Sequence, residues 1–114
     1  MANIYLNAKK DLTTNTVTTV YTVPSNSRAI VKSLLVSDDS GSGSNITVDL
    51  FNGDPASADK FNLFKTQTLT ANETLQLLTE PLIMLENEVL QVTAADANRL
   101  FVVASILEIN REDR

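Results

Sequence analysis

The chain has 114 residues, 43% of them hydrophobic and 20% charged, with no histidine, cysteine or tryptophan and a net charge of −5. This length predicts a single domain, residues 1–114, whose core is large enough to fold without metal or disulfide support. The absence of cysteine excludes disulfide-stapled folds and zinc ribbons. The negative charge argues against a nucleic-acid partner, because such binding needs clustered Lys and Arg to displace counterions.

No apolar run approaches the roughly 20 residues of a membrane span, so we expect no membrane partner. The first ten residues, MANIYLNAKK, lack the basic start and apolar middle of a signal peptide. We therefore expect a protein that is made and kept soluble in the cytoplasm until it assembles.

The N-terminal half reads as strands separated by polar turns. Residues 1–11 are expected to form an N-terminal arm outside the main fold. Residues 16–23 and 28–37 are rich in Val, Ile, Thr and Tyr, which favour a pleated, half-buried surface. A proline-containing turn separates these two strands, since proline fixes φ and donates no backbone hydrogen bond. Residues 38–45 follow as a flexible Ser/Gly loop.

The middle of the chain continues the strand pattern. Residues 46–50 alternate cleanly, which puts Ile46, Val48 and Leu50 on one face. Residues 52–60 form a second loop, and residues 61–70 form the next strand. We expect both loops to lie on the surface and to be the most mobile internal segments, since Gly and Ser carry a large ordering entropy.

The C-terminal half adds residues 74–79, 82–85, 88–94 and 99–109 as strands, with turns at 71–73, 86–87 and 96–98 and a polar tail at residues 110–114. A helix over residues 75–90 is the weaker alternative, because Pro81 would break it. The eight strands predict an all-β domain, an antiparallel sandwich of jelly-roll or immunoglobulin-like type.

The last strand is apolar on both faces. Leu100, Val102, Ala104 and Ile106 fall on the face assigned to the core, opposite residues 46–50, Leu90 and Val92. The second face also carries apolar side chains, namely Phe101, Val103, Leu107 and Ile109. Either a loop or arm of the same chain covers this second face, or it is a subunit interface.

No residue pattern points to catalysis, a cofactor or a bound metal, so we predict no site residues of these kinds and no enzymatic activity. Asp38, Asp39, Asp54 and Asp59 lie in the two polar loops, where we expect ordinary ionised surface groups. A calcium site there is an alternative, although the spacing does not match an EF-hand loop. Lys32 and Ser33 could pair only if they shared a face, and neighbours on a strand point to opposite faces.

Several segments resemble a group of small virion proteins of tailed bacteriophages. The resemblance covers residues 16–109 and is carried by TVYTVP at 19–24, RAIVKS at 28–33, LTANETL at 69–75, LQVTA at 90–94 and LEI at 107–109. It implies a β-sandwich protein of the head-decoration (cement), neck or tail-associated kind, located in the virion, and it transfers no catalytic or ligand residues.

The resemblance implies a capsid decoration protein that binds the major capsid protein or other virion proteins and stabilises the shell. Neck, tail or fibre-base components are the first alternative, and a carbohydrate-binding module for host recognition is the second. The last strand, which is apolar on both faces, predicts a homo-oligomer, and the symmetry of a shell favours a trimer.

Overall fold

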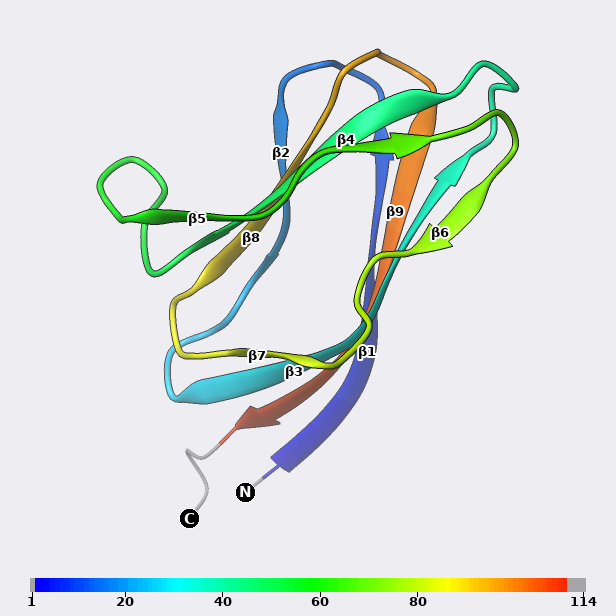
Figure 1. Ribbon diagram of the computed structural model, residues 1–114. Coiled ribbons are helices and arrows are strands. Elements are labelled where there is room, and N and C mark those ends of the chain that lie inside the picture. Colours follow the sequence, from blue (N-terminus) through cyan, green and yellow to red (C-terminus); the bar gives the residue numbers. More distant parts are fainter. Residues whose placement is uncertain (1, 111–114) are drawn as a thin grey trace.

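The computed structural model describes residues 2–110 and is built from antiparallel strands alone (Figure 1). Nowhere in this range does the chain form a helix long and apolar enough to cross a membrane. The nine strands of the described range are β1 (Ala2–Leu12), β2 (Val17–Thr22), β3 (Ser27–Asp38), β4 (Ser44–Phe51), β5 (Lys60–Leu69), β6 (Thr74–Gln76), β7 (Leu82–Met84), β8 (Val89–Ala94) and β9 (Leu100–Asn110).

The strands form two sheets that pack face to face. Sheet A has the order β1-β9-β3-β6, with β7 also paired to β3, and sheet B has the order β2-β8-β4-β5. The antiparallel pairs are nested along the chain: β4 with β5, β3 with β6 and β7, β2 with β8, and β1 with β9. A long hairpin folded over in this way is a jelly roll. The predicted all-β antiparallel sandwich is confirmed, and its topology is the jelly-roll alternative.

Strands β6 and β7 occupy one position in this topology. β6 pairs with Leu35–Ser37 of β3, and β7 pairs with Ala29–Val31. The segment between them contains Pro81, which fixes φ and donates no ladder hydrogen bond. If β6 and β7 are counted as one, the jelly roll has eight strands. The number equals the prediction, but the predicted set counted residues 74–79 and 82–85 as two strands and did not include β1.

The expectation that residues 1–11 form an arm is wrong for the residues that the structure describes. Residues 2–11 do not lie outside the sandwich, because β1 pairs with β9 from Ala2↔Asn110 to Leu12↔Leu100 without a register shift. Asn110, expected to begin a polar tail, is the last residue of β9, and residues 111–114 lie outside the described range. The strand was missed because an edge strand needs few apolar residues, and β1 carries Asn, Lys and Asp on its exposed face.

The core between the sheets is aliphatic. Its buried cluster is made of Leu, Val, Ile, Ala and Met side chains, while Tyr21 and Phe64 pack against it from the edge. The predicted inward face of β9 is confirmed, since Leu100, Val102, Ala104 and Ile106 are all at most 2% exposed. The facing residues of sheet B are also buried (Ile46, Val48, Leu90 and Val92), and Leu50 is half-buried.

The predicted turns share one backbone feature. Asn26, Asn72, Asn87 and Asn98 all have positive φ values between 61° and 68°. Asparagine tolerates this left-handed region better than other residues with a side chain, since its short amide can bond locally. The turns at 24–27, 71–73, 86–87 and 96–98 are therefore specified locally.

Candidate functional site

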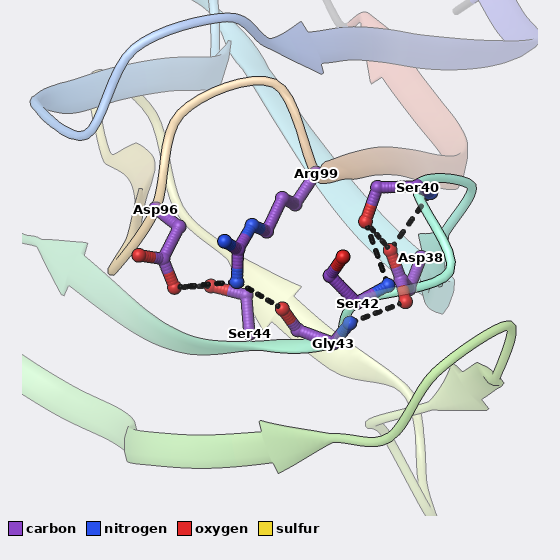
Figure 2. Close-up of polar contacts among 7 residues, drawn as sticks. All are labelled: Asp38, Ser40, Ser42, Gly43, Ser44, Asp96 and Arg99. Carbon is purple, nitrogen blue, oxygen red and sulfur yellow. Dashed lines mark hydrogen bonds and ion pairs between the residues drawn. The ribbon is translucent and has the colours of Figure 1, made fainter.

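Asp38, at the end of β3, is the centre of the densest polar network in the described chain (Figure 2). Its Oδ1 accepts hydrogen bonds from the Ser40 amide at 2.9 Å and the Ser40 hydroxyl at 2.6 Å. Its Oδ2 accepts hydrogen bonds from the amides of Gly43 at 2.7 Å and Asn72 at 3.1 Å. Asp38 is only 5% exposed, so the expectation of an ordinary solvated carboxylate is wrong for this residue.

These hydrogen bonds explain both the charge state and the role of Asp38. The Ser40 hydroxyl, and then the amides of Ser40, Gly43 and Asn72, hold the pKa of the Asp38 carboxyl well below its usual range, against the opposing effect of desolvation. Both oxygens face N–H and O–H donors, which is the opposite of what a cation requires. The carboxylate therefore acts as an internal anion that ties the β3–β4 loop to the β5–β6 turn.

Arg99 extends the network to the β8–β9 turn. Its Nη1 donates a hydrogen bond to the carbonyl oxygen of Gly43 at 3.1 Å and lies 3.5 Å from Oδ2 of Asp96 (Figure 2). Ser44 donates a hydrogen bond from Oγ to the same Asp96 oxygen at 3.0 Å. Three connections at one end of the sandwich are therefore held together by side chains from separate parts of the chain.

Gly43 is required at the centre of this network. Its φ is +73°, and a Cβ placed on it would lie 2.8 Å from the carbonyl oxygen of Leu69. Any side chain would force the loop away from β5 and away from the Asp38 carboxylate. The Ser/Gly composition of this loop thus reflects close packing at Gly43 as well as exposure at residues 39–42.

The network predicts uneven hydrogen exchange within residues 38–45, a loop that was expected to be among the most mobile internal segments. The Gly43 amide is buried on the Asp38 carboxylate, whereas residues 39–42 are exposed. We expect the Gly43 amide to exchange more slowly than the Gly41 amide by on the order of tenfold or more, since exchange at Gly43 requires the network to open. Amide exchange followed by NMR tests this, and equal rates at the two glycines would contradict it.

The other loop carboxylates do not join Asp38. Asp54 and Asp59 are exposed and lie at the opposite end of the β4–β5 hairpin, because Ser44 pairs with Leu69 at one end and Phe51 pairs with Lys60 at the other. Asp54 Oδ1 accepts a hydrogen bond from the Ala56 amide at 3.0 Å within its own turn. Within residues 2–110, no group of three or more Asp and Glu side chains is arranged to hold a metal ion.

This arrangement predicts that chelators leave the protein unchanged. We expect EDTA to shift the melting temperature by less than about 1 °C, since removing a metal lowers the stability only of a folded state that binds one. Calorimetry with and without EDTA provides the measurement. A loss of several degrees, restored by added calcium, would show a metal site.

Lys32 and Ser33 lie differently from the prediction. The pairing of β3 with β9 shifts register between Val31 and Ser33, and both Val31 and Leu34 are buried. Lys32 and Ser33 therefore both lie on the outer side of sheet A, so the expectation that they face opposite ways is wrong. The Lys32 Nζ lies 6.0 Å from the centroid of the Tyr5 ring, where a cation–π interaction stabilises it.

The outer face of sheet A carries many apolar side chains. All of its apolar side chains are at least partly exposed, so no loop or arm within residues 2–110 buries this face. Tyr5 is 75% exposed and Ile83 64%. The face is made by Tyr5 of β1, Ile30 and Leu35 of β3, Ile83 of β7, and Phe101, Val103, Leu107 and Ile109 of β9.

No family model and no curated protein sequence matches the chain. Structures from infectious bursal disease virus (IBDV) do match. The IBDV viral particle aligns with a TM-score of 0.56 at 11% identity, covering 94% of this chain and 30% of that chain. The structure of the Gx strain aligns with a TM-score of 0.53 at 12% identity, covering 99% of this chain and 32% of that chain. The VP2 subviral particle aligns with a TM-score of 0.50 at 13% identity, covering 95% of this chain and 32% of that chain.

At these identities the likeness establishes the fold. The chain spans about a third of the length of the viral chains that it matches. At least 94% of this chain therefore has the same fold as a portion of those viral chains.

Proposed function

We propose that this chain is a non-enzymatic structural protein of a virion, a capsid decoration (cement) protein that binds the major capsid protein and stabilises the shell. The observation that carries the proposal is the nested jelly roll over the whole described chain, which is shared with chains of IBDV particles. The bacteriophage part of the proposal rests on the sequence resemblance over residues 16–109.

The polar clusters are consistent with this role. The Asp38 network uses its donors and acceptors internally to hold three connections together, which stabilises a scaffold rather than binding a substrate. The apolar outer face of sheet A offers a surface for protein contacts of the kind that a protein seated on a larger assembly needs.

The carbohydrate-binding alternative has less support from the geometry. A sugar-binding platform needs aromatic rings on one surface. The most exposed aromatic side chains within residues 2–110, Tyr5 and Phe61, lie on β1 of sheet A and β5 of sheet B. They therefore present no shared stacking surface.

Copy counting in purified particles tests the proposal. Quantitative mass spectrometry of particles of the encoding virus should find the chain in many copies, in a fixed ratio to the major capsid protein. A few copies per particle would favour a neck, tail or fibre-base component instead. Absence from particles, together with binding on a glycan array, would overturn the proposal in favour of the carbohydrate-binding module.

A further inference from the structure

The strand β1 presents a long free edge. One side of β1 pairs with β9, and none of the strands within residues 2–110 pairs with its other side. Backbone N–H and C=O groups along such an edge are a template for another strand. Proteins normally protect these edges by bulges, short strands or charged side chains, so an edge that is long, unbroken and uncharged over most of its length is open to a partner strand.

The other three edges of the sandwich are interrupted. β2 has a register shift between Thr19 and Tyr21, and β5 has two shifts along its pairing with β4. The fourth edge is formed by β6 and β7, which have only three residues each. β1 differs from all of them, because its eleven residues pair with β9 in unbroken register.

The charges on β1 select one kind of pairing. Lys9, Lys10 and Asp11 lie together at its C-terminal end, while residues 2–8 carry no charge. An antiparallel partner strand of the same sequence would place the charged end of each copy opposite the uncharged half of the other. A parallel partner in register would instead place each lysine beside its own copy, which is unfavourable.

We propose that two copies of the chain pair β1 to β1 in antiparallel fashion, about a two-fold axis at Asn7, so that the two copies of sheet A form one continuous sheet. This register uses the full length of β1. It places the exposed Tyr5 ring opposite Lys9 of the second copy and Asn3 opposite Asp11 of the second copy. The inference goes beyond the proposed function, because the pairing is a property of the isolated chain.

Single-cysteine cross-linking tests the register, since the chain has no cysteine of its own. In the proposed dimer Asn7 lies opposite its own copy, at the roughly 4.5–5.5 Å Cα separation that a disulfide spans. We expect Asn7→Cys to form a cross-linked dimer with oxidised glutathione. The matched control is Asn3→Cys, which is also exposed on β1 but would lie about 27 Å from its own copy and should form no disulfide-linked dimer.

A mixture of the Asn3→Cys and Asp11→Cys proteins should cross-link, because these positions face each other across the axis. Equal cross-linking of Asn7→Cys and Asn3→Cys would show random collision and overturn the register. A wild-type protein that sediments as a monomer at high concentration, with no cross-linking at Asn7→Cys, would overturn the pairing altogether.

Charge substitutions distinguish association through the β1 edge from association through the outer face of sheet A. Tyr5→Lys would oppose Lys9 of the second copy at two symmetric places, and we expect the dimer dissociation constant to rise by on the order of tenfold in sedimentation equilibrium. Ile83→Lys is the control, because Ile83 is similarly exposed in sheet A but lies on β7 at the other edge. Weaker association with Ile83→Lys and not with Tyr5→Lys would overturn the edge pairing in favour of contact through the outer face.

The outcomes remain separate from those of the proposed function. A dimer cross-linked at Asn7→Cys, made by a chain that is absent from virions, would leave this inference standing and overturn the virion role. The two-fold pairing also differs from the trimer expected from shell symmetry. A trimeric mass without cross-linking at Asn7→Cys would overturn the two-fold pairing and support the trimer.

Discussion

Val102→Asp should unfold the protein or lower its free energy of unfolding by about 4 kcal/mol or more. Val102 is the third residue of β9, is fully buried, and packs in the aliphatic cluster between the two sheets. A carboxylate there would have no hydrogen-bonding partner, and the Val side chain would be lost as well. For a chain of this length, the loss corresponds to a fall in melting temperature of roughly 15 °C or more.

Val103→Asp is the matched control. Val103 is the next residue of β9, but it lies on the outer face of sheet A and is half-exposed, so we expect a loss of about 1 kcal/mol or less. If Val102→Asp does not fold, Val102→Ala should still unfold at lower denaturant, with a loss of about 2 kcal/mol. A larger loss from Val103→Asp than from Val102→Asp would show that β9 is turned the other way.

The strands and turns between residues 16 and 109 could be predicted because their signals are local. Alternation over residues 46–50 placed Ile46 and Val48 on the inward face of β4, and Asn in each turn supplied the positive φ that ends a strand. The choice between jelly roll and immunoglobulin-like topology could not be made from the sequence, since it depends on which distant strands pair. The pairing of β1 with β9 joins the two ends of the described chain.

The Asp38 network was missed for the same reason. Its carboxylate is bonded both to the loop that follows it and to the Asn72 amide, which lies 34 residues further along the chain. A Ser/Gly-rich segment beginning with Asp is typical of a solvated loop, and only the close approach of Gly43 to β5 buries this one. A local signal did exist, because Asp followed by Ser two residues later is a common side-chain-to-backbone turn.

Asp38→Asn should lower the melting temperature by roughly 5–10 °C. Each carboxylate oxygen accepts two hydrogen bonds, from Ser40 on one side and from Gly43 and Asn72 on the other. In either orientation, the NH₂ group of the substituted amide would face N–H donors. The better orientation points it toward Ser40, whose hydroxyl can turn to accept, but the Ser40 amide is then unsatisfied.

The pH dependence identifies the charge of Asp38 as the cause of this loss. Because the folded-state pKa of Asp38 is depressed, its contribution to stability is complete above its unfolded-state pKa of about 3.9 and is lost as pH falls below that value toward the folded-state pKa. The melting-temperature difference between wild type and Asp38→Asn should therefore shrink between about pH 5 and pH 2. Asp39→Asn, at the exposed neighbouring position, should stay within about 2 °C of wild type near neutral pH. A constant difference between wild type and Asp38→Asn across this range would mean that amide geometry, and not the carboxylate charge, sets the loss.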